Sequence, residues 1–496
     1  MQSVKVTLHS KNIVGDVDPR IFGGFLEHIG RAVYQGVYDP ASIHADKDEF
    51  RKDVLEALRR LNMTVMRYPG GNFASGYHWR DGIGPTHLRP KLQELAWKSI
   101  EPNQFGTDEY IKLCRKMGWK PMITVNLGSG SPEEARSWVE YCNSLPGTRD
   151  ADLRARNSTE PHDVKLWCLG NEMDGPWQIG NLPAEQYALR ARQAAKLMKT
   201  VDPGIELVAC GSSSPAMATY ADWDRQVLEG VGEAADYISL HRYVGNLNND
   251  TPDYLAITNS IDRQIEVIDA CCRFVQAKSR SVIRTYLCFD EWNVWYKNRQ
   301  MDGGWQRAPH LVEEIYNLED ALVVTGFINS FIRHADVVKL ANIAQIVNVI
   351  APILTRGDEI LLQSIFYAFE MFSKRRHGTS LRPIIEGPTY EGKTNGPACL
   401  IDTSAILDTD RLHFFSTNRH TEKPTTVQLR LVDRDIVALE SGELLTGPNA
   451  KAANTFEQPN LVKSIPLSES DSRKLAGGEF TLELPPLSAA ALTFRL

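Results

Sequence analysis

Two glutamates stand where catalytic carboxyl groups are expected, because each follows a short apolar run. Glu172 comes after the run 164–169, and Glu291 comes after the run 286–289. The length of both runs and their β-branched and aromatic content are typical of strands covered on both faces. In a barrel of parallel strands, catalytic groups lie at the carboxyl ends of the strands, so residues far apart in the chain can meet there. The sequence therefore predicts that Glu172 and Glu291 face each other.

Two facing carboxyl groups are what the hydrolysis of a glycosidic bond requires. One must be protonated to give the leaving oxygen a proton, and the other must be ionised to attack or to activate water. A single glutamate at the start of a loop is more often a solvated side chain or a helix cap than a catalytic group. Asn171 directly before Glu172, and the repetition of the pattern on a second run, favour the catalytic interpretation.

The elements that must position these residues alternate between strand-like and helix-like patterns. Amphipathic stretches with apolar residues three or four positions apart separate the strand candidates, as in 54–61 and 194–201. This alternation predicts a (β/α)₈ TIM barrel over residues 16–375, in which the two glutamates end the fourth and seventh strands. The eight strand candidates are 21–25, 64–68, 122–125, 164–169, 207–209, 237–240, 286–289 and 338–341.

Beyond about residue 374 the apolar residues alternate with a period of two. Examples are Val427, Leu429 and Leu431, and later Phe480 and Leu482, with Pro, Gly and Ser between the runs. This pattern predicts a C-terminal all-β sandwich, jelly-roll-like, over residues 376–496. The alternating residues 4–8 are not needed for the barrel, so residues 1–15 are expected to join the sandwich.

Composition narrows the classes of function. The 496 residues exceed what one hydrophobic core usually supports, and the net charge of −7 with a pI near 6.0 offers no basic surface for nucleic acid or anionic lipid. Eight scattered cysteines without metal-ligand spacing indicate buried thiols, and no metal or other cofactor is expected. Without an apolar leader, or a run of about 18 apolar residues, a cytoplasmic protein without a membrane partner is expected.

Four longer motifs resemble those of the α-L-arabinofuranosidases of glycoside hydrolase family 51. They are FGGFLEHIGRAVY from Phe22, RYPGGNF from Arg67, WCLGNEMDGPW from Trp167 and DEWNVWY from Asp290. The similarity extends along essentially the whole chain, including PPLS from Pro485. It implies a retaining mechanism with Glu172 as the acid/base and Glu291 as the nucleophile, and it suggests a homohexamer.

The resemblance also implies roles for seven further residues. Trp97 and Trp295 would shape the pocket, and the residues that would hydrogen-bond the furanose are Glu27, Asn72, Asn171, Tyr243 and Gln345.

The supporting residues also have structural explanations. Glu27 could pair with Arg31 one turn on, Asn72 could be a turn residue tolerant of positive φ, and His241 could orient Glu291 or fill space. Trp97 could be a surface residue or a lid over the pocket, and Trp295 could belong to the core. Gln345 has the weakest support from pattern alone.

Three hypotheses about function follow. The leading one is an exo-α-L-arabinofuranosidase that removes terminal non-reducing arabinofuranose from arabino- and arabinoxylo-oligosaccharides. The second is another retaining barrel glycosidase, such as an endoglucanase or a β-xylosidase, which would need an open cleft. The third is a catalytically silent sugar-binding protein. Both glutamates are present, and residues 376–496 contain no tryptophan that could form an aromatic binding strip, so the third is disfavoured.

Overall fold

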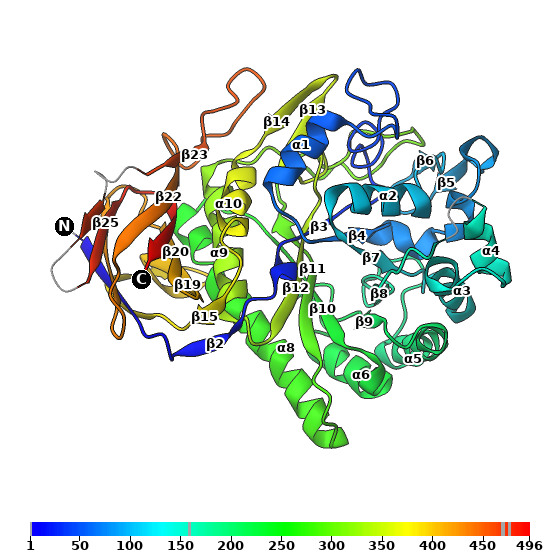
Figure 1. The fold of residues 1–496 in the computed structure, drawn as a ribbon, viewed down its shortest axis with the longest axis horizontal. Helices are drawn as coiled ribbons and strands as arrows, with labels where there is room; N and C mark the ends of the chain where they lie inside the picture. The colour runs from blue at the N-terminus through cyan, green and yellow to red at the C-terminus, as the bar shows by residue number, and fades with distance from the viewer. Residues whose placement is uncertain (1, 157–159, 468–471, 475–477) are drawn as a thin grey trace.

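Eight parallel strands close into a barrel in the order in which they occur along the chain (Figure 1). The computed structural model describes residues 2–156, 160–467, 472–474 and 478–496. The barrel confirms the predicted fold class and puts Glu172 three residues after the end of the fourth strand and Glu291 inside the seventh. The strands are β3 (Gly23–Phe25), β4 (Val65–Tyr68), β7 (Lys120–Thr124), β8 (Leu166–Leu169), β9 (Glu206–Ala209), β10 (Tyr237–Val244), β11 (Tyr286–Val294) and β12 (Val338–Ala344).

Helices surround the barrel as the apolar periodicity predicts. The first strand is shorter than predicted, because Asp18 caps a 3₁₀ turn, η1 (Pro19–Ile21), by accepting from the backbone N–H of Arg20 at 2.9 Å. The helices are α1 (Lys52–Arg60), α2 (Thr107–Met117), α3 (Pro132–Asn143), α4 (Arg149–Ala155), α5 (Ala184–Val201), α6 (Asp222–Val231), α7 (Thr251–Leu255), α8 (Thr258–Ser279), α9 (Leu318–Arg333) and α10 (Ser364–Ser373). Further 3₁₀ turns are η2 (Asn72–Gly76), η3 (Trp79–Gly82), η4 (Thr86–Leu88) and η5 (Gly232–Ala234).

The C-terminal part is β-rich, with one five-stranded and one seven-stranded sheet. The five-stranded sheet has the order β16 (Ile384–Glu386), β1 (Gln2–Leu8), β21 (Thr425–Leu431), β25 (Phe480–Leu484), β24 (Ser472–Lys474). The seven-stranded sheet has the order β2 (Ile13–Asp16), β15 (Thr379–Leu381), β19 (Ile401–Asp408), β20 (Arg411–Asn418), β26 (Ser488–Arg495), β22 (Ala438–Thr446), β23 (Lys463–Pro466). Three small hairpins are β5 (Leu92–Glu94) with β6 (Ser99–Glu101), β13 (Ile353–Arg356) with β14 (Glu359–Leu362), and β17 (Thr389–Gly392) with β18 (Gly396–Cys399).

The alternating residues of the C-terminal part face a common core. Val427, Leu429 and Leu431 are buried together with Val4 and Val6, because β1 lies parallel to β21 in one sheet. The N-terminal strand therefore belongs to this β-rich part, as the alternation predicted. The exact domain limits, 16–375 against 1–15 with 376–496, stay a prediction.

Helices α9 and α10 lie between the barrel and the β-rich part (Figure 1). The start of α9 is joined to the segment 449–453. The backbone N–H groups of Leu318 and Glu319 donate to the carbonyl groups of Ala452 (2.9 Å) and Ala450 (3.0 Å). These donors have no partner inside their own helix, so the β-rich part satisfies them. Lys451 Nζ adds an ion pair with Glu319 Oε1 at 2.5 Å.

None of the eight cysteines forms a disulfide, and six of them are buried, which confirms the prediction of buried thiols. Among the described residues, no helix has both the length and the apolar content needed to cross a membrane.

Candidate active site

A cavity of about 470 Å³ is lined by side chains from the carboxyl ends of the barrel strands. Asn171 is buried beside the cavity rather than lining it, and its Oδ1 accepts from Arg67 Nη2 at 2.7 Å. The other sequence-predicted residues all line the cavity. They are Glu27, Asn72, Trp97, Glu172, Tyr243, Glu291, Trp295 and Gln345.

The two glutamates meet at this cavity. A carboxylate oxygen of Glu172, one of Glu291 and a ring nitrogen of His241 all lie within 4.8 Å of one another. Glu172 has a φ of 43°, a left-handed conformation that is uncommon outside glycine and that is often found at functional sites. This turn lets the chain leave β8 while the carboxyl group faces the end of β11.

Two donors hold the carboxylate of Glu291 in one orientation. Arg67 Nη1 donates to Oε1 at 2.7 Å, and the Tyr243 hydroxyl donates to Oε2 at 3.0 Å. Arg67 is completely buried, and its Nη2 also lies 3.2 Å from Asp290 Oδ2. Burial alone would lower the pKa of Arg67, but the charges of Asp290 and Glu291 outweigh it and raise the pKa well above its usual value.

His241 lies between three carboxylates. Its Nδ1 is 2.9 Å from Glu172 Oε1 and 3.5 Å from Glu291 Oε2, and its Nε2 is 3.1 Å from Asp290 Oδ1. Burial acts to lower the pKa of His241, but Glu291 and Asp290 together raise it well above its usual value. An imidazolium ion is the consistent state, so His241 orients the glutamates rather than merely filling space.

Glu27 is held in the wall of the cavity by three donors. Its Oε1 accepts from Trp97 Nε1 at 3.1 Å and from the backbone N–H of Phe73 at 3.0 Å, and its Oε2 accepts from Gln345 Nε2 at 3.1 Å. The pairing of Glu27 with Arg31 is wrong, because Arg31 instead contacts Glu313 at 2.7 Å. Burial, followed by the charge of Glu291, raises the pKa of Glu27 to about 8.

The structure contradicts a positive φ for Asn72 and a surface position for Trp97, whereas Trp295 both lines the cavity and packs against the core. Asn72 begins η2 and is not among the residues with positive φ, and its Oδ1 accepts from Asn171 Nδ2 at 3.5 Å. Trp97 is buried against Glu27 rather than lying on the surface, and Trp295 meets Tyr243 edge to face, with ring centres 5.5 Å apart. Gly71, directly before Asn72, leaves room for the Glu27 carboxylate, since a Cβ there would lie 2.7 Å from Glu27 Oε2.

Comparison with known proteins agrees with this geometry. Residues 57–255 match the model of the α-L-arabinofuranosidase 1 domain, and residues 290–488 match that of the α-L-arabinofuranosidase C-terminal domain. An intracellular exo-α-(1→5)-L-arabinofuranosidase 1 of Bacillus subtilis is 41% identical over 488 residues, 97% of each chain. A family 51 α-L-arabinofuranosidase structure from Bifidobacterium longum superposes with a TM-score of 0.95 at 36% identity, covering all of both chains. The chain belongs to this family.

A second relative agrees with the first. The intracellular exo-α-(1→5)-L-arabinofuranosidase of Acetivibrio thermocellus is 44% identical over 431 residues, 85% of this chain and 86% of its own. A glucanase-xylanase with a TM-score of 0.61 and 14% identity shares the fold alone. Membership of the arabinofuranosidase family therefore favours the first of the three functional hypotheses over the other barrel glycosidases and over a silent sugar-binding protein.

This family 51 chain contains a site residue that the sequence analysis did not single out. Trp177 lines the cavity with about half of its surface exposed, and its Nε1 donates to Glu172 Oε2 at 2.6 Å. It lies in the motif WCLGNEMDGPW, five residues after Glu172, so the motif was the available signal. Arg67 and Asp290 were missed as well, although each stands in a quoted motif.

In this arabinofuranosidase family member, the set Glu172, His241 and Glu291 has the donor types and closeness that a small divalent cation needs. The raised pKa of His241 opposes such binding, because a protonated ring nitrogen cannot coordinate a metal. The two glutamates and the imidazolium ion are better suited to proton transfer than to metal binding.

Proposed function

We propose that this chain is a retaining exo-α-L-arabinofuranosidase in which Glu291 is the nucleophile and Glu172 the acid/base. The observation that supports this most directly is the closeness of the two carboxyl groups, since an oxygen of one lies within 4.8 Å of an oxygen of the other. Retaining glycosidases hold the two groups about 5–5.5 Å apart, whereas inverting enzymes need a wider gap for a water molecule. Glu291 is oriented by Arg67 and Tyr243, as a nucleophile requires.

In the first step, a Glu291 oxygen attacks the anomeric carbon while the glycosidic bond breaks and Glu172 gives its proton to the departing oxygen. In the second step, Glu172 takes a proton from water, the water oxygen attacks the same carbon and the ester to Glu291 breaks. The positive His241 beside Glu172 and Glu291 stabilises the carboxylates that form at each stage.

The furanose is proposed to occupy the part of the cavity between Glu291 and Glu27. With a pKa near 8, Glu27 is mostly protonated at pH 7 and can both donate to and accept from a sugar hydroxyl. Trp97 and Gln345 hold Glu27 at this wall, which fits removal of one terminal residue. Asn72, Asn171, Tyr243 and Trp295 would complete the contacts of the sugar.

The leaving part of the substrate is proposed to lie against Trp177, the exposed aromatic side chain next to Glu172. Arabino- and arabinoxylo-oligosaccharides are the proposed substrates. Relatives are named for α-(1→5) and, in one Bifidobacterium longum protein, for α-(1→6) linkages, so the linkage is left open. Because several relatives are named intracellular, we also propose a cytoplasmic enzyme of arabinan catabolism that needs no cofactor.

The test is hydrolysis of p-nitrophenyl α-L-arabinofuranoside by the wild type, Glu172→Ala and Glu291→Ala, each with and without azide. Loss of either carboxyl group should lower kcat by at least about 100-fold. Azide should restore Glu172→Ala and yield the α-arabinofuranosyl azide, since it replaces water in the second step. With Glu291→Ala any azide product should be the β anomer.

A wild type that ignores this substrate but cleaves a xyloside or a glucan would disprove the proposed specificity. An initial wild-type product with inverted configuration, seen by proton NMR, would disprove the retaining mechanism. We also propose a homohexamer, as the family resemblance suggests. Analytical ultracentrifugation should then give six times the chain mass of 55.7 kDa.

A further inference from the structure

The turn that follows the nucleophile strand carries a wall of the cavity. Residues 295–298 come directly after β11, and the first of them, Trp295, lines the cavity next to Tyr243. A loop at this position would ordinarily be adaptable, because few of its backbone groups are paired. Here the backbone of the turn is instead bound by one buried side chain.

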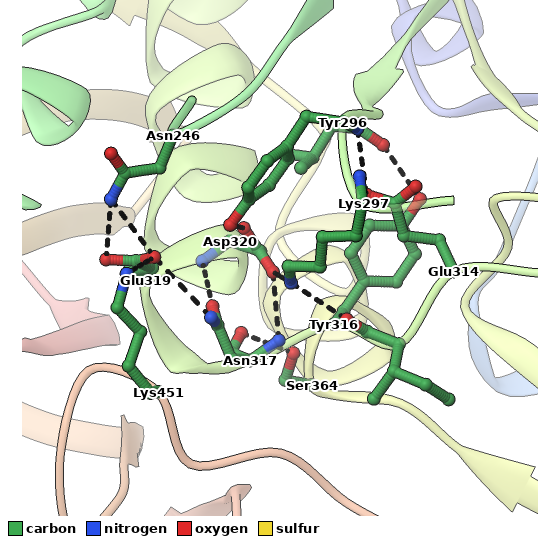
Figure 2. A network of polar contacts seen from close by, with 12 residues as sticks. Asn246, Tyr296, Lys297, Glu314, Tyr316, Asn317, Glu319, Asp320, Ser364 and Lys451 are labelled. Atoms are coloured by element: carbon green, nitrogen blue, oxygen red, sulfur yellow. Dashed lines mark hydrogen bonds and ion pairs between the residues drawn. The ribbon is translucent and has the colours of Figure 1, made fainter. Parts of the chain in front are cut away.

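That side chain is Glu314, which is fully buried. Its Oε1 accepts from the backbone N–H groups of Tyr296 (2.9 Å) and Lys297 (3.0 Å), and its Oε2 accepts from that of Asn298 (3.2 Å). Figure 2 shows the carboxyl group facing the backbone of Tyr296 and Lys297. Within the part of the chain that the structure describes, Glu314 has no ion pair with a cationic side chain. The backbone of the turn is therefore its main partner.

Asn298 connects the Glu314 carboxylate to the Trp295 side chain that lines the cavity. The carbonyl oxygen of Asn298 accepts from the indole Nε1 of Trp295 at 2.8 Å, and its side chain donates to the carbonyl of Glu313 at 3.1 Å. The orientation of the Trp295 ring thus depends on where the backbone of Asn298 lies. That position is fixed in turn by Oε2 of Glu314.

The surroundings of Glu314 prevent compensating movement. Gln363 Nε2 donates to the Glu314 carbonyl at 2.9 Å, and the Tyr316 hydroxyl donates to the Val294 carbonyl at 2.8 Å. Lys297 is tied to the buried Asp320 at the start of α9, as Figure 2 shows. Both sides of the contact are therefore anchored, so the loss of one hydrogen bond cannot be repaired by a small shift.

We propose that Glu314 is a positioning residue that sets the Trp295 wall of the sugar pocket. This inference rests on the proposed function, since it assumes that Trp295 contacts the bound arabinofuranose. Glu314 touches neither the reacting groups nor the substrate. It acts through the backbone of Asn298 and the indole N–H of Trp295.

The test is Glu314→Gln, which keeps the shape of the side chain. One amide oxygen can still accept from Tyr296 and Lys297, but the amide N–H₂ then faces the N–H of Asn298, so two donors oppose each other. We expect KM for p-nitrophenyl α-L-arabinofuranoside to rise about tenfold, the effect of one lost hydrogen bond, with kcat within about threefold of the wild type. Glu313→Gln is the matched control, because that adjacent carboxylate binds Arg31 and not the turn.

A double-mutant cycle identifies the route of the effect. Trp295→Phe removes the indole N–H but keeps an aromatic wall, so KM of Glu314→Gln combined with Trp295→Phe should be close to that of Trp295→Phe alone. Independent, multiplicative effects of the two changes would overturn the proposal. So would an unchanged KM in Glu314→Gln, or a KM rise of the same size in Glu313→Gln.

Trp295→Ala separates this inference from the proposed function. If Trp295→Ala leaves KM unchanged, Trp295 is not a wall of the sugar pocket and the proposed site fails with the inference. If Trp295→Ala raises KM while Glu314→Gln does not, only the inference fails.

Discussion

His241 donates to Glu172, with 2.9 Å between Nδ1 and Oε1, while its Nε2 lies 3.1 Å from Asp290. Glu172 follows β8 and His241 lies within β10, so the two residues are brought together by the side-by-side order of β8, β9 and β10 in the sheet. The imidazolium ion therefore connects the proposed acid/base to the carboxylate beside the proposed nucleophile. Its charge has a consequence for stability.

The contribution of His241 to stability should depend on pH. Because its pKa in the folded protein is raised above the unfolded value of about 6.5, the contribution is complete below that pH and is lost as pH rises through the folded value. The difference in free energy of unfolding between the wild type and His241→Asn should therefore shrink between pH 6 and pH 9, as measured by urea unfolding.

His413 provides the control with the opposite sign. Burial, followed by the charge of Arg375, lowers the pKa of His413 to about 4, so its contribution is present above about pH 6.5 and is lost on acidification. The difference in free energy of unfolding between the wild type and His413→Asn should not shrink as pH rises. The assignment of an imidazolium ion to His241 would be contradicted if both variants behaved alike.

Ionisation of Glu27 should make the activity of the enzyme fall at alkaline pH. Ionisation of this carboxyl group near pH 8 removes a proton that can be donated to the sugar and places a second negative charge near Glu291. Wild-type kcat/KM, which reports groups in the free enzyme, should fall on the alkaline side with an apparent pKa near 8. Glu27→Gln should be less active, and its profile should lack the fall with an apparent pKa near 8. A fall that persists in Glu27→Gln must come from another group.

Variants of Trp177 should separate the effect of its hydrogen bond to Glu172 from the effect of its aromatic surface on substrate binding. Trp177→Phe loses the donor to Glu172 but keeps an aromatic surface, so we expect a lower kcat, by about 3- to 10-fold. Trp177→Ala should in addition raise KM for arabino-oligosaccharides about tenfold, because stacking area for the leaving part is lost. Phe274→Ala on α8 is the control, as an equally exposed aromatic residue that does not line the cavity. If Trp177→Phe and Trp177→Ala had equal KM values for these oligosaccharides, the stacking role of Trp177 would be refuted.

Lys451 should stabilise the contact between the barrel and the β-rich part. Figure 2 shows Glu319 between Asn246 and Lys451. Glu319 is fully buried and also accepts from Thr251, so Lys451→Met removes its cation but not all of its hydrogen bonds. The free energy of unfolding should fall by about 1–3 kcal/mol. Lys463→Met, an exposed lysine on β23, should change it by less than about 0.5 kcal/mol. Similar losses in both variants would mean that the ion pair adds nothing.

The sequence alone determined the architecture and the two glutamates. Period-two and helical patterns are local, so they predicted eight barrel strands, the alternating core of the β-rich part and the joining of β1 to it. Strand ends in a parallel barrel converge by topology, which is why Glu172 and Glu291 could be paired without knowing any distance.

Only the tertiary structure decided which charges compensate one another. Arg31 lies four residues after Glu27, yet it pairs with Glu313, because the chain after β3 does not continue as a helix. Arg67 and Asp290 meet across the barrel, and Glu314 binds a turn that lies 16 to 18 residues before it. Such contacts depend on where loops place side chains after the barrel closes. No periodicity in the sequence records that placement.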